Sequence, residues 1–415
     1  MGSVDPSATA WLLASTALVV AMVFGVAFFY SGLVRRKNAV NMIATSVMAL
    51  SVAGVQWVLV GFTLAFSGDA LWGFSGDLKA LGLRGYGLEA PEGLSVPGAL
   101  YAAFQGAFAA VTAAILTSPF AERASFLGFT VFTLAWLTLV YSIVAHWVWA
   151  GGLADKVAYA LTGEHPVDFA GGLVVHTASG FSALAVALVL GPREGYGMRQ
   201  FQPHNIPLSA LGAAILWAGW FGFNAGSALE ASGLAGNALL VTHVAASSGA
   251  LAWGVASWVF NGRPGLLGML SGAIAGLVAI TPASGYVNPL DAIVIGALGA
   301  LASYLALSWR LRSGVDESLD AWAIHGVAGL TGSLLTGVFA RQGIGGVAGL
   351  LEGNPSLLAA QLVAAVVVVV YSLIASYLIA LAVDKTLGLR VKPEEEMVGL
   401  DISQHAEEAY GWAEA

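Results

Sequence analysis

The sequence predicts an all-helical integral membrane protein, and three observations point to this fold class. The 415 residues are 58% hydrophobic and only 10% charged, whereas soluble domains carry about 25% charged residues. Apolar stretches recur along the chain, and most are long enough to cross a hydrocarbon core about 30 Å thick. The stretches are continuous, as from Leu362 to Leu373, rather than alternating, which favours helices over a transmembrane barrel.

Eleven such stretches follow one another with short connections, so the sequence predicts one membrane domain over residues 1–383. The expected helices run approximately over 8–31, 41–66, 98–118, 127–150, 171–190, 207–227, 235–259, 266–282, 288–308, 321–340 and 356–382. A charged segment, residues 384–415, follows the last helix and is expected to be a cytoplasmic tail.

The basic residues predict the orientation, because cytoplasmic loops carry an excess of Lys and Arg. Placing the N-terminus outside the cell and the C-terminus inside puts most of the Lys and Arg residues in the inner loops and tail. The inner set is then Arg35, Arg36, Lys37, Arg123, Arg193, Arg199, Arg263, Arg310, Arg312, Lys385, Arg390 and Lys392, and the outer set is Lys79, Arg84, Lys156 and Arg341. We therefore expect a multi-pass protein of the cell membrane.

Composition also excludes several classes of function. The net charge of −8 offers no basic surface for nucleic acid. The chain has no cysteine, so disulfides, thiolate metal sites and cysteine nucleophiles are excluded. No His-Glu-x-x-His segment occurs that would indicate a zinc protease. We expect neither an enzyme nor a metal or cofactor site.

An internal repeat links the two halves of the membrane domain. His176–Ser182 in the fifth stretch and His325–Thr331 in the tenth both read His, three small or apolar residues, Gly, a large apolar residue and a hydroxyl residue. Gly25–Gly32 in the first stretch has a weaker counterpart in Gly219–Gly226 of the sixth. The repeats, about 8–190 and about 207–340, have five helices each. Because five is odd, the second repeat must be inverted, as in transporters with a midplane site. The helix at about 356–382 is additional.

Four histidines lie in the apolar stretches, where an ionisable group is costly and indicates a site. For His146 and His243 we expect a neutral ring held by a hydrogen bond between helices. His176 and His325 are related by the repeat, so we expect them at matching depths and with a function. A neutral pair of imidazoles can join by a hydrogen bond, and such a pair can hold a small polar solute or relay a proton.

Two aspartates begin the stretches that contain this pair. Asp168 lies eight residues before His176. It is expected either to stabilise a cation near the outer mouth or to cap the helix, and both roles are compatible. Asp320 begins the tenth stretch in a comparable way, and there capping is favoured.

Aromatic residues gather in the third, fourth and sixth stretches. Phe104 and Phe108 lie four residues apart and so share one helix face. The others are Trp147, Trp149, Trp220, Phe221 and Phe223, with Asn224 and Ser227 following them. Each ring alone fits an interfacial belt or ordinary packing. A cluster at the outer mouth would bind a small cation through the ring faces, at about 2 kcal/mol or more per desolvated contact.

Together these residues resemble the ammonium transporter (Amt/MEP/Rh) family, on the Amt side. The resemblance covers essentially the whole chain. Its strongest segments are Asp168–His176, Gly219–Ser227 and Asp320–Gly326, with further matches in Ala121–Arg123 and Gly399–His405.

The resemblance implies a homotrimer in which each eleven-helix subunit has its own pore for ammonium or methylammonium. It implies an outer recruitment site of Phe108, Trp149 and Ser227, with Phe108 and Phe223 stacked as a gate below. His176 and His325 are similar to the twin histidines of the pore, and Asp168 to the acidic residue that the charged substrate needs. Supporting positions are Phe104, Trp220 and Asp320, and the 122–123 pair is structural.

In this family the tail often contacts a signalling protein of the PII type, so such a partner is expected at the cytoplasmic face. The tail departs from the family pattern in one respect that bears on signalling to the pore. It reads His405-Ala406-Glu407, where many members have glycine after the histidine.

A dehydrated ammonium ion in a medium of low dielectric costs tens of kcal/mol by idealised solvation, whereas neutral ammonia has no such penalty. We therefore expect ammonia to cross the pore while the proton moves separately, so that net charge is transported. One alternative is a Rhesus-type channel for neutral ammonia. A different class is a membrane cytochrome with His176 and His325 as axial ligands. An ammonium sensor is a third, although the tail is short for a signalling domain.

Overall fold

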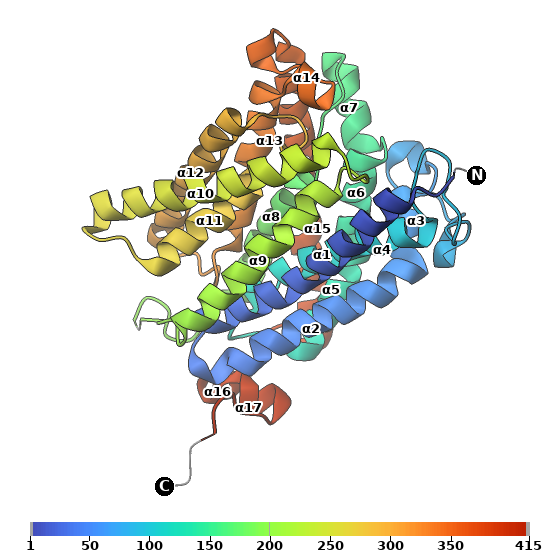
Figure 1. The fold of residues 1–415 in the computed structure, drawn as a ribbon. Coiled ribbons are helices and arrows are strands. Elements are labelled where there is room, and N and C mark those ends of the chain that lie inside the picture. The colour runs from blue at the N-terminus through green and yellow to red at the C-terminus, as the bar shows by residue number, and fades with distance from the viewer. Residues whose placement is uncertain (1–2, 199, 412–415) are drawn as a thin grey trace.

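The computed structural model describes residues 3–198 and 200–411, and within them the chain is a bundle of helices (Figure 1). Ten helical segments of the described residues are long and apolar enough to cross a membrane. The same residues contain two isolated bridges and no longer β-structure. The all-helical membrane fold is therefore confirmed, while Arg199 and residues 412–415, which entered the predictions above, lie outside the described residues.

The helices fall into two halves, an additional long helix and a tail. The first half comprises α1 (Pro6–Leu33), α2 (Ala39–Gln56), α3 (Phe62–Phe66), α4 (Gly98–Ile115), α5 (Phe126–Trp136), α6 (Ser142–Trp149), α7 (Leu153–Thr162) and α8 (Ala178–Leu190). The second comprises α9 (Ile206–Gly226), α10 (Gly233–Asn261), α11 (Leu266–Ile280), α12 (Pro289–Ser313), α13 (Ala328–Phe339) and α14 (Gln342–Gly345). They are followed by α15 (Pro355–Leu387), α16 (Pro393–Val398) and α17 (Leu400–His405).

Shorter helical turns connect or interrupt these helices. The turns of the 3₁₀ type are η1 (Arg36–Asn38), η3 (Leu71–Gly73), η4 (Leu81–Leu83), η5 (Ser118–Phe120) and η9 (Leu350–Glu352). The π-helical turns are η2 (Trp57–Gly61), η6 (Leu137–Tyr141), η7 (Gly172–Thr177) and η8 (Trp322–Val327). The sequence pattern predicted none of the π turns, since they preserve the apolar stretch that contains them.

α11 is shorter than the predicted stretch 266–282. Its 15 residues span about 22 Å at 1.5 Å per residue, which is less than a hydrocarbon core. All residues from Gly272 to Ile280 are buried, so neighbouring helices rather than lipid surround that part of α11. A short helix is tolerated there because protein covers its end.

The two halves pack as inverted repeats. α1 and α9 lie side by side and antiparallel (Figure 1), because the end of α1 meets the start of α9. Glycines allow the close approach: a Cβ at Gly32 would meet Ser209, and one at Gly212 would meet the backbone of Phe29. A Cβ at Gly219 would overlap Met22, nearer the other end of α1. This antiparallel contact agrees with the inverted arrangement predicted from the short sequence repeat.

The second crossing between the halves joins η7 and α8 to η8 and α13. A Cβ at Gly180 would overlap the backbone of Gly326, and one at Gly329 would press on Gly172 and His176. These contacts also run antiparallel. Each repeat therefore supplies one glycine, four residues after its histidine, that lets the opposite π turn approach.

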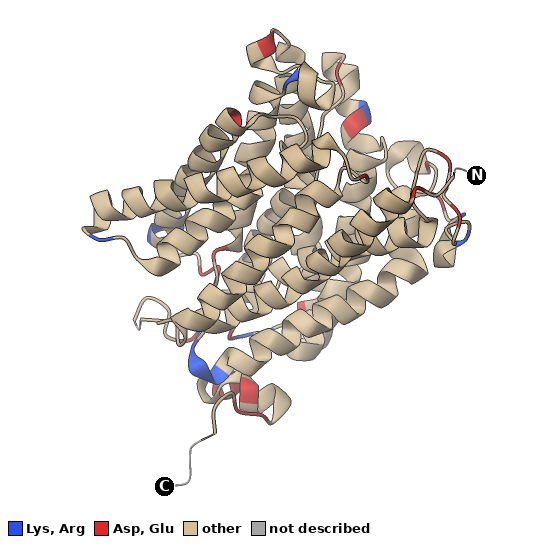
Figure 2. Cartoon of the chain, in the orientation of Figure 1, with Lys and Arg blue, Asp and Glu red and all other residues tan. Residues whose placement is uncertain are grey.

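The tail helices lie at the end of the bundle where α1 ends, because α17 packs on η1 and α2. Figure 1 accordingly shows the start of α1 and the tail helices α16 and α17 at opposite ends of the bundle. Most charged residues also lie at these two ends, and the middle of the bundle is largely uncharged (Figure 2). This distribution fits a protein whose middle section lies in hydrocarbon.

We predict that Gly180→Ala destabilises the protein by about 1–3 kcal/mol, the usual cost of overpacking, because the added methyl overlaps Gly326. The midpoint of thermal unfolding in detergent measures this effect. Gly236→Ala is the control, since no atom lies within 4 Å of its Cβ position. Equal midpoints for the two variants would contradict the close crossing.

Candidate functional site

The centre of the site is a direct contact between His176 and His325. Their Nδ1 atoms lie 3.2 Å apart, and the ring planes are inclined by 26° at a centroid distance of 5.3 Å. Both side chains are buried. When the pair is neutral, one Nδ1 donates and the other accepts, so the accepting ring carries its own proton on Nε2. The pair therefore presents one N–H and one lone pair on its two Nε2 atoms.

Asp168 holds the π turn that carries His176. Its carboxylate accepts four backbone N–H groups, from Gly171 at 2.9 Å, Gly172 at 2.6 Å, Leu173 at 2.8 Å and Val174 at 3.2 Å. A carboxylate has about four lone-pair positions, so these bonds use its full accepting capacity. The capping role expected for Asp168 is confirmed.

The backbone of Asp168 also fixes Trp149. Its carbonyl oxygen accepts the indole N–H of Trp149 at 2.8 Å. Asp168 thus connects the position of Trp149 with that of His176. Gly171, three residues after Asp168, has φ +110°, and a Cβ at this position would overlap Val175 and press on Trp149.

The prediction that Asp320 caps the tenth helix is wrong. The Asp320 carboxylate pairs with Arg310 of α12, and its backbone has φ +65°. The cap is instead Glu317, whose Oε2 accepts the N–H of Trp322 at 3.2 Å. The repeat could have identified it, because Glu317 precedes His325 by eight residues, as Asp168 precedes His176.

A ring cluster lies on the side of the histidines that is remote from the tail. Phe108 and Phe223 stack at a centroid distance of 4.0 Å and an angle of 19°. Phe104 meets Phe108 edge to face at 4.9 Å, and Trp149 does so at 6.1 Å. A hollow of about 170 Å³ adjoins these rings and is lined by Phe66, Tyr101, Phe104, Gln105, Phe108, Trp149, Phe169, Ser227 and Leu229. Sequence reasoning missed Phe66, Tyr101, Gln105, Phe169 and Leu229, which carry no pattern that separates them from packing residues.

The ring cluster continues to the histidine pair. Phe223 lies 5.9 Å from the His176 ring, and Trp220 stacks on that ring at 5.3 Å. Trp220 is fixed by a 2.9 Å bond from its indole N–H to Thr281. Ser227 donates its hydroxyl proton to the Phe223 carbonyl at 2.9 Å, so its oxygen can still accept. The hollow, the phenylalanine pair and the histidines therefore form one continuous series.

The remaining aromatic and histidine candidates lie outside this series. His146 is buried, and its Nδ1 lies 3.1 Å from the carbonyl oxygen of Ala65, which confirms the expected bond between helices. The same expectation is wrong for His243, which is exposed and contacts the rings of Trp217 and Phe221. Trp147 donates to the carbonyl of Phe74 at 2.8 Å and is a packing residue.

A buried ion network lies on the side where the tail docks. Arg123 and Arg193 both contact Asp316, at 3.0 Å and 2.7 Å, and Glu122 receives Arg193 at 2.7 Å and Arg35 at 3.0 Å. Burial raises the pKa of Asp316, but Arg193 and Arg123 outweigh this effect and hold that pKa below its ordinary value. Burial lowers the pKa of Arg123 to about 10, so the guanidinium is still charged at neutral pH. The network joins the two halves.

A hollow of about 560 Å³ adjoins this network. Its charged lining residues are Glu122, Arg193, Arg310, Arg312 and Asp320. The tail reaches the same end of the molecule: Asp401 accepts the N–H of Asn41 at 2.8 Å, and His405 lies 3.0 Å from the Asn41 amide nitrogen. The tail is thus bonded to the start of α2.

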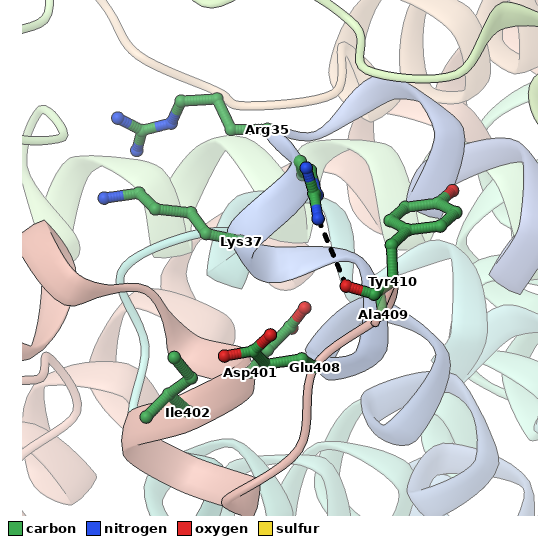
Figure 3. A pocket seen from close by; sticks show the side chains of 8 residues that line it. Arg35, Lys37, Asp401, Ile402, Glu408, Ala409 and Tyr410 are labelled. Carbon is green, nitrogen blue, oxygen red and sulfur yellow. Dashed lines mark hydrogen bonds between the residues drawn. The ribbon is translucent and has the colours of Figure 1, made fainter. Parts of the chain in front are cut away.

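Figure 3 shows a second cavity, of about 400 Å³, between the end of α1 and the tail. It is lined by Arg35, Arg36, Lys37, Asp401, Ile402, Glu408, Ala409 and Tyr410. Arg36 donates to the Tyr410 carbonyl at 3.1 Å, the bond drawn in the figure. Ala406, the departure from the family pattern, has φ +56°. The tail therefore turns where glycine would adopt the same backbone without strain.

Comparison with known proteins agrees with this geometry. A family model described as the Ammonium Transporter Family matches residues 10–410. The chain belongs to the ammonium transporter family.

Ammonium transporter Amt1 of Archaeoglobus fulgidus is 49% identical over 401 residues, which cover 97% of this chain and 98% of that protein. The crystal structure of Saccharomyces cerevisiae Mep2 has 35% identity and a TM-score of 0.87, over 95% of this chain and 89% of Mep2. A solved Sensor Amt Protein has 29% identity and the same TM-score, over 96% of this chain and 98% of that one. The family places this chain in the cell membrane as a transporter.

We predict that Asp316→Asn destabilises the protein by about 3–5 kcal/mol, the usual cost of leaving a buried charge unpaired, since Arg123 and Arg193 both face it. Thermal unfolding in detergent provides the measurement. Asp69→Asn is the matched control, because Asp69 is half-exposed and pairs with Lys156, and exposed pairs contribute about 1 kcal/mol or less. A loss no larger than that of the control would show that the network is not structural.

Proposed function

We propose that this ammonium transporter separates its substrate into ammonia and a proton, and that the two cross the membrane by different routes. The observation that carries the proposal is the 3.2 Å contact between His176 and His325, directly beyond the Phe108–Phe223 stack. Ammonium binds in the outer hollow, loses its proton, and ammonia then passes the phenylalanines and the imidazoles. The proton crosses separately, and each cycle moves charge.

The outer hollow suits a small cation. The faces of Trp149 and Phe108 offer negative electrostatic potential, and the Ser227 oxygen offers a hydrogen-bond acceptor. Methylammonium has the same charge and N–H donors, so it is the expected analogue. The phenylalanine pair beyond the hollow acts as a gate, since stacked rings at 4.0 Å leave no space between them.

Asp168 acts in this proposal through position rather than through contact with the ion. Its carboxylate is committed to four backbone N–H groups, and its carbonyl holds Trp149. The negative charge still lowers the energy of a cation in the neighbouring hollow by electrostatic attraction. Phe104 and Trp220 support Phe108 and His176 by ring contacts.

Because the basic residues are unequally distributed, we further propose that the aromatic hollow faces outside and the tail faces the cytoplasm, with α11 completing eleven crossings. A homotrimer with one pore per subunit follows the family plan. The tail and the inner hollow form the surface for a PII-type signalling protein.

The alternatives are less well supported. Two nitrogens bound to one iron at about 2 Å each would lie about 4 Å apart with a porphyrin between them, whereas the imidazoles contact each other at 3.2 Å. A channel for neutral gas needs no aromatic hollow for a cation. Charge movement distinguishes such a channel from the proposed mechanism.

We predict that ammonium pulses on proteoliposomes evoke currents on a solid-supported membrane, and that His176→Ala and His325→Ala abolish selective charge movement or admit competing cations. Either change removes one ring of the only imidazole pair that the described residues place beyond the gate. His165→Ala is the control, because this histidine is largely exposed and pairs with Asp155.

Absence of current in the wild type at every ammonium concentration would support a gas channel. Unchanged selectivity in both pair variants, with normal behaviour of the control, would remove the histidines from the mechanism.

We predict that Trp149→Leu raises the ammonium concentration for half-maximal current by about thirtyfold, the equivalent of about 2 kcal/mol, with a smaller effect on the maximal current. The change removes a ring face from the hollow but leaves the gate. Trp258→Leu, on the exposed face of α10, is the control. An unaltered half-saturating concentration would contradict a role in capture.

A further inference from the structure

Glu317 occupies in the second repeat the place that Asp168 occupies in the first. Each lies eight residues before a histidine of the pair. Each carboxylate also accepts backbone N–H groups at the π turn that carries that histidine. Asp168 accepts three from η7 and one from the preceding Gly171, and Glu317 accepts one from η8. The two residues therefore occupy corresponding positions in the two inverted repeats.

The surroundings of the two acids are also related by the repeat. The segment around Asp168 bonds to the end of α11, where Phe169 N–H donates to the Pro282 carbonyl at 3.1 Å. Glu317 bonds to the segment just after α4, where Ser118 donates its hydroxyl to the carboxylate. Both contacts involve a hydroxyl–proline pair, Ser118–Pro119 or Thr281–Pro282, at the end of the third helix of the opposite repeat.

The hydrogen bonds of the two carboxylates differ. Four N–H donors occupy Asp168, whereas Glu317 has one N–H and one hydroxyl although it is completely buried. Burial and the neighbouring Asp320 raise the pKa of Glu317 to about 7, while Ser118, Arg310 and the Trp322 N–H favour its charged form. Arg123, beyond α4, and Tyr30, on α1, complete the surrounding groups. Glu317 therefore populates both protonation states at neutral pH.

Glu317 is bonded to the histidine segment and precedes residues that line the inner hollow. The next residues, Ser318 to Asp320, line that hollow. Trp322, which bonds to Glu317, begins the π turn that contains His325. A proton that leaves the histidine pair towards the tail end thus passes the loop containing Glu317.

We propose that Glu317 is the inner proton-exchange residue of the pathway, receiving the proton from the histidine side and releasing it to the inner hollow. The inference rests on the proposed separate movement of the proton. In each cycle one carboxylate oxygen forms an O–H bond as an imidazolium gives up its proton through intervening water. That bond breaks when water in the hollow accepts the proton, and the carboxylate returns to its charged form.

The test is Glu317→Gln, which preserves size and the acceptor for Trp322 but cannot titrate. We expect charge movement in response to ammonium to fall at least tenfold, with an unchanged half-saturating concentration, because the outer hollow is intact. When the pH on the inner side is varied, the wild-type current is expected to show an inflection near neutral pH. The variant is expected to lack this inflection. Glu394→Gln, on the exposed side of α16, is the matched control and should behave as the wild type.

Ser118→Ala provides a second readout that a purely structural role would not move. It removes a hydroxyl donor that stabilises the charged Glu317 carboxylate. The inflection in the dependence of the current on pH should therefore move to higher pH. An unchanged current and pH profile in folded Glu317→Gln would overturn the inference, as would an unmoved inflection in folded Ser118→Ala.

If the Glu317→Gln variant does not fold, infrared difference spectroscopy of the wild type tests the inference. We expect the carbonyl band of a protonated buried carboxyl group to disappear as the pH rises through neutrality, and to shift in frequency in Glu317→Asp. Absence of that band in the wild type would overturn the inference. A wild type without any ammonium-evoked current would instead overturn the proposed function itself, so the two failures are distinguishable.

Discussion

The contact between His176 and His325 depends on two inverted segments approaching to within backbone distance in the middle of the bundle. Gly180 against Gly326, and Gly329 against Gly172, provide that approach. The π turns η7 and η8 place the two rings at the crossing, and π turns are frequent at functional sites. The capping acids and the Trp220 stack then orient rings whose separation the crossing has already determined.

Desolvation explains why chemical groups change along the permeation route. In the proposed mechanism the ion loses part of its hydration at the outer hollow, and aromatic faces with one hydroxyl oxygen compensate for part of the loss. Beyond the phenylalanine stack, Trp220 and Phe223 contact the His176 ring, and in the proposed mechanism these apolar surroundings suit neutral ammonia better than ammonium. Charged side chains reappear at the inner hollow, where Arg310 and Asp320 face each other. This order favours deprotonation after capture.

The two inverted repeats are not identical, and the residues at which they differ distinguish the two ends of the bundle. Asp168 is saturated by backbone donors, and its carbonyl holds Trp149. The related Glu317 has fewer donors and an acidic neighbour. The inner end also carries the ion network around Asp316 and the docked tail, whose Asp401 bonds to the start of α2. One backbone plan thus carries two different acids, to which the proposals assign a role near the capture site and a role in proton exchange.

The sequence by itself determined the helical membrane fold, the inverted repeat and the identity of the histidine pair, because hydrophobic length, an odd helix number and a repeated motif are properties of the chain alone. Tertiary structure decided what short patterns cannot encode. Asp320 is nearer than Glu317 to the predicted start of the tenth helix, and the placement of Arg310 and Trp322 shows that Glu317 is the cap. His146 and His243 look alike in sequence, but only His146 meets a carbonyl group on a neighbouring helix. The physical reason is that capping, stacking and pairing depend on which segments approach each other, and that approach is a property of the packed bundle.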